Sequence, residues 1–398
     1  MVRHEPARSY HGSTLMKRAR AFEDIVRSLT WPRLLAAGAL ALRPARVVMS
    51  LVLMLIVGLI AQAPTIWLGK DTGPAHTFAE RAAGGFQRVQ RSILEFDVQA
   101  LASGLWQACV DAPMAAAREF PWSSLAIGLP ILAVWSVLGG AMSRLAAEEH
   151  ALSQHRPWTA GLAFAVSRWF SFAACVIGPI VVLLLACGLM ACAGWLMLGV
   201  PFLNVAGGVL YGLALAMGAV VTVLGAALLL GSPMLVPALA CEGSDAIDGV
   251  QRVWAYTLAR PGRLALYLLT LLVQLVLALW ALGLLVGAIE SLTAWSTTAL
   301  LNKESADALR DAAAGGDMPT DARSHVKLAG RIMTFWGAIP NLLVGAFAVS
   351  FWFSGGTVLY LCMRRVCDAQ DVEELWRPDL TPGTLPTPGG EDDDDAEG

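Results

Sequence analysis

Long apolar runs divide this sequence into segments of membrane length. Five runs reach the roughly 20 residues that a helix needs to cross a bilayer, and a sixth segment of similar length contains no charged residue. The six predicted spans are 47–68, 123–142, 172–198, 206–230, 264–289 and 339–363. This pattern predicts an all-α fold, a polytopic membrane helical bundle of about six transmembrane helices with interfacial amphipathic helices.

The composition excludes a soluble domain. Of the 398 residues, 56% are hydrophobic and only 15% are charged, whereas a soluble domain carries about 25% charged residues. The formal net charge is −3, and the sequence contains no nucleic-acid-binding motif. We therefore expect the lipid bilayer, and no nucleic acid, among the partners of this chain.

The distribution of Lys and Arg predicts the orientation, because positively charged flanks are retained on the cytoplasmic side. The first 46 residues hold nine of them, and the segments on the side of the termini hold 18 against 10 on the other side. We expect a multi-pass protein of the inner (cytoplasmic) membrane with both termini cytoplasmic. The predicted parts are a basic N-terminal segment 1–46, a membrane domain 47–369 with external helical segments 70–122 and 290–338, and an acidic, disordered, Pro/Gly-rich tail 370–398.

The first external segment has an amphipathic pattern. Apolar residues recur every three to five positions between His76 and Phe120, which predicts a helix. Such a helix can lie in the headgroup plane, pack on its own bundle or pair with a partner helix, and we take 86–109 as a candidate binding element. The second external segment is predicted as two shorter helices separated by a turn at 315–319.

The predicted spans contain no Asp, Glu, Lys, Arg or His in their interiors, although ion-coupled transporters and intramembrane enzymes need such groups at depth. No Walker loop, GxSxG, HExxH or calcium-loop motif occurs, and the seven cysteines show no metal-ligand spacing. We therefore expect no catalytic residue, no cofactor, no metal and no enzyme activity. A membrane-embedded lipid enzyme is the minor alternative, with Glu149, His150, Glu242 and Asp245 as the available donors.

Two predicted cytoplasmic connections, 143–171 and 231–263, resemble each other. Each leaves a span through small residues, meets acidic residues, forms a short amphipathic stretch and meets arginine before the next span. This predicts a weak internal repeat with interfacial helices at about 158–166 and 244–256. The second helix is expected to be capped by Ser244 and stopped by Pro261-Gly262.

The second connection carries the candidate contact site. Basic and aromatic residues at headgroup level anchor helices in most membrane proteins, and they also bind anionic lipids or partner proteins. Glu242 is expected to pair with an arginine beneath the bundle. The candidate contact residues are Glu242, Arg252, Trp254, Tyr256, Arg260 and Arg263.

Four stretches carry a resemblance: Gly139–Ala147, Ala163–Trp169, Val236–Ala246 and Tyr256–Pro261. They resemble a family of planctomycete-type multi-spanning inner-membrane proteins. The resemblance covers about 139–267, with a weaker match at 360–366. Its most specific motif is Glu-Gly-Ser, followed by an amphipathic helix and then by Arg-Pro. The sequence departs from the family at 251–253, where Ser-Arg-Ser is usual, and at the more polar 148–150. That family has no established activity, so the resemblance implies the architecture and no function.

Two functions stay open at this point. The first is a non-enzymatic protein that organises or assembles a membrane complex through its interfacial helices, with a protein partner, a second copy of the chain or an anionic lipid as candidate partners. The alternative is a permease-like subunit for a neutral or lipid-like solute. Its helix breaks would lie at Gly178-Pro179, 199–208, Pro233, Pro237 and Gly355-Gly356.

Overall fold

The computed structural model of the chain describes residues 31–65, 73–95, 97–199, 202–301, 306–307 and 324–376. Across these residues every regular element is a helix, and six helices are long and apolar enough to cross a membrane. They are α4 (Pro44–Gln62), α9 (Pro121–Leu152), α11 (Trp169–Gly199), α12 (Leu203–Glu242), α14 (Pro261–Thr298) and α16 (Ser324–Asp368). The predicted fold class, an all-α polytopic membrane bundle, is confirmed.

Most of the long helices extend beyond the predicted spans. The helix α12 has 40 residues where the sequence predicts a span over 206–230, and α16 has 45 residues. Small and polar residues at the ends of the apolar runs do not stop a helix, and Pro233 and Pro237 lie inside α12. Because about 20 residues suffice to cross the hydrocarbon, the last turns of α9, α12 and α16 are available for charged residues.

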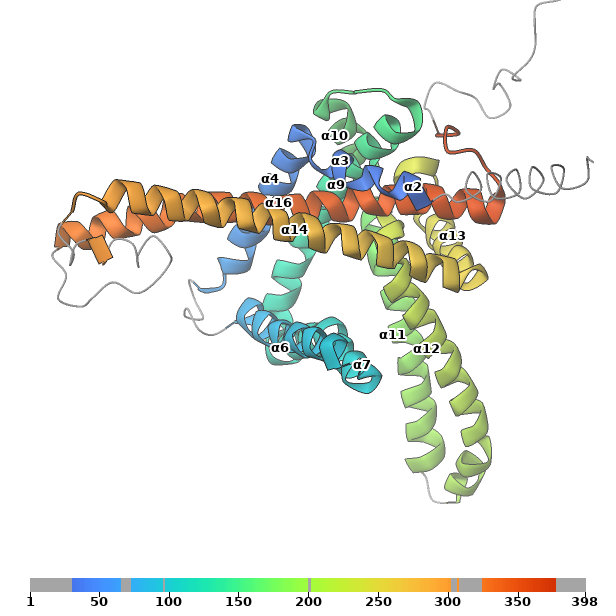
Figure 1. The fold of residues 1–398 in the computed structure, drawn as a ribbon. Coiled ribbons are helices and arrows are strands. Elements are labelled where there is room, and N and C mark those ends of the chain that lie inside the picture. The colour runs from blue at the N-terminus through green and yellow to red at the C-terminus, as the bar shows by residue number, and fades with distance from the viewer. Residues whose placement is uncertain are drawn as a thin grey trace, which may run out of the picture.

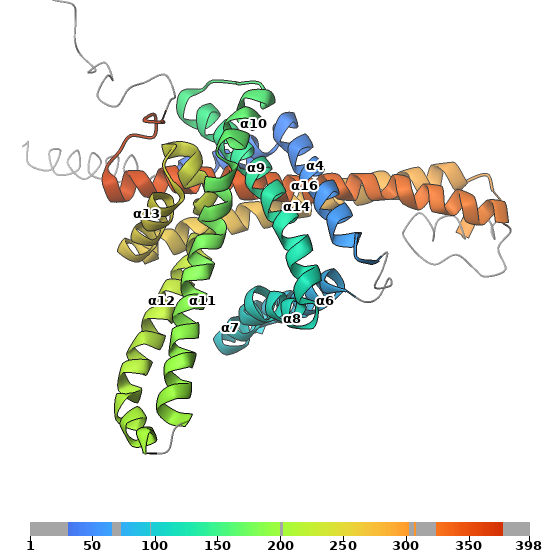
Figure 2. The same cartoon turned by 180° about the vertical axis from the view of Figure 1, so that it is seen from behind.

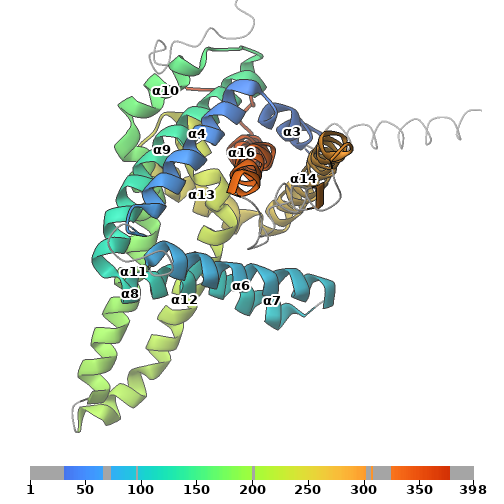
Figure 3. The same cartoon turned by 90° about the vertical axis from the view of Figure 1, so that its left-hand side faces the viewer.

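The long helices meet at a common centre and diverge away from it. The hairpin of α11 and α12 projects in one direction, while α14 and α16 lie side by side and extend in another (Figures 1 and 2). Figure 3 views α14 and α16 nearly end-on, with α4 and α9 beside them. The central helix is α16. In an 18-residue apolar stretch of α16, 61% of the residues are buried, compared with 6% in the corresponding stretches of α12 and α14.

Glycine permits the closest helix crossings at this centre. A Cβ on Gly356 of α16 would collide with the carbonyl oxygen of Pro233 in α12. A Cβ on Gly139 of α9 would likewise collide with the ring of Phe353 in α16. Small residues let membrane helices approach this closely. Glycine and proline therefore pack helices together here, within helices that run without a break.

Short segments at both ends of the described chain also pack on the centre. The helices α2 (Trp31–Leu34) and α3 (Ala36–Ala41) contribute fully buried apolar side chains, and the segment 369–376 buries Val372 and Leu375. Residues 31–46 and 370–376 thus pack on the bundle, although the sequence pattern places them in the terminal segments. The reason is their apolar side chains, whose burial is favourable. The rest of the two predicted terminal segments, 1–30 and 377–398, lies outside the described residues.

The segment 70–122, which is predicted to be external, contains a helical hairpin instead of one helix. Its elements are α6 (Pro74–Glu95), α7 (Val98–Trp106), the π-helical η1 (Gln107–Asp111) and α8 (Ala112–Glu119). The carboxylate of Asp97 caps α7 by accepting hydrogen bonds from the backbone N–H groups of Gln99 and Ala100. The chain reverses at this cap, and α7 and α8 fold back against α6. The candidate element 86–109 is therefore part of a helical hairpin.

The described part of the segment 290–338, which is also predicted to be external, extends two membrane helices. Residues 290–298 continue α14 and residues 324–338 begin α16, where two separate shorter helices are expected from the sequence. Neither stretch contains a proline that would end a helix. The Asn341 amide donates a hydrogen bond to Glu290 at 2.8 Å, which joins the two helices. The predicted turn at 315–319 lies outside the described residues.

The two similar connections share one order of elements. The helices α10 (Trp158–Ser167) and α13 (Ala246–Ala259) stand where the interfacial helices are predicted. Each follows a residue in the left-handed region, Ser153 (φ 53°) after α9 and Gly243 (φ 59°) after α12. Both short helices end at an arginine C-cap. The N-cap of α13 is Asp245 and not Ser244, because the backbone of Asp245 is the extended residue before the helix.

Candidate functional site

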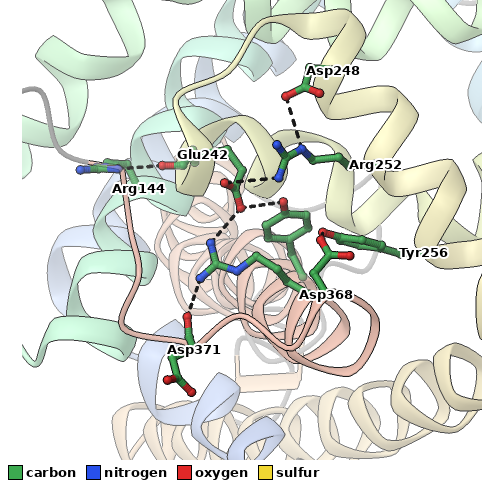
Figure 4. Close-up of polar contacts among 10 residues, drawn as sticks. Arg144, Glu242, Asp248, Arg252, Tyr256, Asp368 and Asp371 are labelled. Atoms are coloured by element: carbon green, nitrogen blue, oxygen red, sulfur yellow. Dashed lines mark hydrogen bonds and ion pairs between the residues drawn. The ribbon is translucent and has the colours of Figure 1, made fainter. Parts of the chain in front are cut away.

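Charged and phenolic side chains gather at the end of the bundle where α12 and α16 finish (Figure 4). We call this group the Glu242 network, and its members are Glu242, Asp248, Arg252, Tyr256, Tyr360, Arg364 and Asp368. Glu242 is the last residue of α12, and Gly243 turns the chain into α13 with a φ of 59°. A Cβ at Gly243 would also collide with the Trp376 indole, so both the conformation and the space require glycine there.

Glu242 is the centre of this network. Its Oε1 accepts hydrogen bonds from Arg364 Nη1 at 2.8 Å and from the Tyr360 hydroxyl at 2.9 Å. Its Oε2 lies 3.6 Å from Arg252 Nη1. The side chains of Arg364 and Glu242 are only 1% and 16% exposed. Charges this buried are stable only when paired and hydrogen-bonded, so the carboxylate fixes α16 and α13 to the end of α12.

Arg252 and Tyr256, one turn apart on α13, extend the network. Arg252 Nε lies 3.3 Å from Asp248 Oδ2, and the Tyr256 hydroxyl donates a hydrogen bond to Asp368 of α16. Burial acts to lower the pKa of Arg252, but the Glu242 carboxylate and its neighbours outweigh burial and raise that pKa. Burial, followed by the hydrogen bond to Asp368, raises the pKa of the Tyr256 hydroxyl. Arg252 is therefore charged and Tyr256 neutral at physiological pH.

Residues 369–376 cross the same end of the bundle as a strap. Arg364 Nη2 donates to the backbone oxygen of Asp371 at 2.9 Å, which ties the start of the strap to α16. The backbone N–H of Trp376 donates to the oxygen of Cys241 at 3.0 Å, which ties the end of the strap to α12. The network and the strap thus share Arg364 and hold the same helix ends together.

Two further arginines hold the last residue of the strap. Arg144 of α9 is 4% exposed, and it donates to the Trp376 oxygen, to Glu148 and to a backbone oxygen of α12 at 2.8–2.9 Å. The Arg168 guanidinium lies 4.5 Å from the centroid of a Trp376 ring and donates to the oxygen of Gly243. A guanidinium stacked on an aromatic ring is a stabilising contact.

The structure brings together only half of the predicted contact residues. Three of the six belong to the Glu242 network. The Trp254 side chain is partly buried against the core, and its indole N–H has no hydrogen-bond partner among the described residues. Arg260 and Arg263 are exposed at the corner between α13 and α14. The predicted cluster therefore separates into an internal group and an exposed pair.

Seven residues of this end are not among the predicted contact residues: Arg168, Asp248, Tyr360, Asp368, Trp376 and the arginines that follow apolar runs, Arg144 and Arg364. A usable signal exists for the two arginines, because each follows an apolar run by no more than two residues. An arginine there must either reach the headgroups or find a partner on a neighbouring helix. Sequence alone does not distinguish these outcomes.

The chemistry that this arrangement supports is ion pairing between helices. Within the described ranges, no group of three or more His, Cys, Asp or Glu side chains is placed to hold a metal ion. No protein-family model matches the sequence, and neither a curated protein nor a solved structure is detectably similar to it. What the chain itself provides is a membrane bundle whose buried charges hold α13 and the strap in fixed positions.

Proposed function

We propose that this integral membrane protein is a non-enzymatic organiser or assembly subunit of a membrane complex. It acts by presenting the outer face of α13 to a protein partner. We further propose the inner membrane, with α13 on the cytoplasmic side, on the basis of the distribution of Lys and Arg. The resemblance to planctomycete-type membrane proteins is compatible with this role and adds no activity to it.

The observation that carries the proposal is the contrast between the two faces of α13. The inner face is locked, because Arg252 and Tyr256 join the Glu242 network and Val253 packs against Gly231 of α12. The outer face keeps Ile247 74% exposed and Leu258 48% exposed. A rigid helix with exposed apolar side chains is suited to binding at low entropic cost.

The charges of the network support a holding role over a catalytic one. Glu242 faces two arginines and a tyrosine hydroxyl, and Arg364 is bonded to both Glu242 and the strap. Groups committed to one another in this way fix helix positions. The permease-like alternative receives little support, since four of its five proposed breaks, at Gly178-Pro179, Pro233, Pro237 and Gly355-Gly356, lie inside continuous helices. The fifth, at 199–208, is the connection where α11 ends and α12 begins.

The structure determines which residues can be replaced to test this proposal. Replacing Arg252 would disturb the Glu242 network, so the test is confined to the exposed residues. The outer-face variant carries Ile247→Ser, Leu258→Ser, Arg260→Gln and Arg263→Gln. The matched control also replaces two exposed apolar and two exposed basic residues: Leu328→Ser, Ile332→Ser and Arg331→Gln on α16, and Arg118→Gln on α8.

Both variants and the parent are purified from native membranes in lipid-preserving particles and analysed by mass spectrometry. We expect one stoichiometric protein, or a second copy of the chain, to accompany the parent and the control but to be absent from the outer-face variant. A parent that is recovered as a single chain with only lipid would contradict the proposal. In that case, solute flux in liposomes becomes the test of the permease-like alternative.

A further inference from the structure

A cavity of about 200 Å³ lies between the start of α4 and the end of α9. Its charged and ionisable wall residues are Arg43, Arg46, Glu149, His155 and Arg156. Arg43 and Arg46 come from the start of α4, and the other three come from the end of α9 and the loop after it. None of these residues belongs to the Glu242 network or to α13.

Positive charge predominates on the wall of this cavity. Glu149 is the single carboxylate that lines it, and its two oxygens lie 2.6 Å from Arg43 Nε and 2.8 Å from Arg46 Nη2. Arg156 lies 3.7 Å from Glu148, whose other oxygen is bound at 2.8 Å by Arg144 outside the cavity wall. Three guanidinium groups and one carboxylate therefore line the cavity, which leaves its wall with an excess of positive charge.

Arg46 is the buried donor that points to a ligand. Its side chain is 2% exposed, Nε donates to the Leu40 oxygen at 2.7 Å, and Nη2 is bonded to Glu149. Among the described residues, Nη1 of Arg46 has no partner. A guanidinium held by two bonds at the wall of a cavity is preorganised to offer its remaining nitrogen to a bound group.

The start of α4 adds to the attraction for an anion. Pro44 is at the first turn of α4, and the N-cap residue Arg43 makes no side-chain capping hydrogen bond. The N-terminus of a helix carries partial positive charge, which favours phosphate. At α4 this charge acts without most of the free N–H groups, because Pro44 has none and the N–H groups of Arg46 and Val47 are bonded to the Arg43 oxygen. The cavity has the volume of about seven water molecules, enough for a phosphate group.

We propose that this cavity binds a phosphate group. The α4 helix is a membrane span whose first residue lines the cavity, so the site stands at the level where the span meets the headgroups. Planar guanidinium groups match the oxygens of phosphate in paired hydrogen bonds. The phosphate can come from an anionic phospholipid or from solution, and the test below separates these sources.

The test uses the full chain in nanodiscs. In one arm the discs contain phosphatidylcholine with a minor fraction of phosphatidic acid, and native mass spectrometry counts the phosphatidic acid that stays bound. In the other arm the discs contain phosphatidylcholine alone, and inorganic phosphate is added while the unfolding midpoint is measured. The variant Arg43→Gln/Arg156→Gln removes two side chains that are each 51% exposed, and Arg118→Gln/Arg331→Gln, at exposed positions of α8 and α16, is the control with the same loss of charge.

We expect the cavity variant to bind its probe about tenfold more weakly than the parent, and the control to bind like the parent. Selective retention of phosphatidic acid assigns the site to lipid, and stabilisation by inorganic phosphate assigns it to soluble phosphate. If the double variant does not fold, Arg156→Gln alone replaces it. A parent that binds neither probe, or a cavity variant that binds like the control, overturns the inference. Since α13 is separate from this cavity, the result is independent of the partner test on its outer face.

Discussion

The guanidinium of Arg364 lies 2.8 Å from the carboxylate of Glu242, although the two residues are 122 positions apart in the sequence. This pair joins the end of the last described helix to the residue from which the chain turns into α13. Arg364 is one of the largest fully buried side chains, together with Arg46. The position of α13 therefore depends on charges contributed by α12 and α16.

Replacing Glu242 by Gln is expected to destabilise the bundle by about 3–5 kcal/mol, because it leaves the buried Arg364 guanidinium without a counter-charge. Thermal unfolding in nanodiscs measures this change. Asp371→Asn is the matched control, since only the backbone oxygen of Asp371 binds Arg364. The double variant Glu242→Leu/Arg364→Leu should recover much of the loss, since an apolar pair needs no counter-charge. Equal midpoints for Glu242→Gln and the parent would show that the pair does not hold these helices.

Gly356→Ala is expected to cost about 1–3 kcal/mol, because the added methyl would collide with the Pro233 oxygen and force α12 and α16 apart. Gly283→Ala on α14 is the control, because a Cβ there meets nothing within 4 Å. The measurement is again the unfolding midpoint in nanodiscs. Similar midpoints for the two alanine variants would contradict the close crossing.

Trp376→Ala is expected to release the strap, because it removes the ring that stacks on Arg168 and fills the space beside Gly243. The cost should be about 1–3 kcal/mol. Hydrogen exchange of the peptide covering 369–376 should become faster, since the Trp376 N–H is bonded to Cys241. Trp195→Ala, at a side chain that is 79% exposed, should leave this peptide unchanged. Fast exchange of the strap already in the parent would be the contrary result.

The hydroxyl of Tyr256 is expected to titrate above the ordinary tyrosine pKa of about 10, because burial and the bond to Asp368 disfavour its charged form. Glu242 adds to the rise and Arg252 opposes it. The pKa of Tyr256 is higher in the folded than in the unfolded state. The contribution of its neutral hydroxyl to the stability of the fold is therefore fully present below the unfolded-state pKa and is lost as the pH rises above about 10. The difference between the tyrosinate absorbance titrations of the parent and Tyr256→Phe reports this pKa. A difference midpoint at the ordinary value would contradict the buried contact.

The long apolar runs contain enough information to predict the six membrane helices and the two short helices α10 and α13. Periodicity and length determine these elements, because a chain in lipid must satisfy its backbone hydrogen bonds internally. The positions of the helix ends are harder to predict from the apolar runs. Charged residues follow Met142 and two prolines follow Gly231, and yet α9 and α12 continue as far as Leu152 and Glu242.

The pairing of the candidate site was only partly predictable. That Glu242 needs a basic partner follows from its place at the end of an apolar helix. That Arg364 meets this need from α16, while Arg260 and Arg263 point outward, depends on the packing of helices distant in sequence. In the sequence, Trp376 directly precedes the acidic, proline-rich stretch, and this neighbouring composition makes the apolar residues of the strap difficult to recognise.

Photo-crosslinking from the outer face of α13 tests the proposed function most directly. A photoreactive amino acid is placed at position 247 and, as the control, at position 213 of α12, where the leucine side chain is 68% exposed. After illumination of native membranes, position 247 is expected to yield one discrete protein adduct, and position 213 only lipid adducts. Lipid adducts alone from both positions would contradict the role of α13 as a docking surface for a protein.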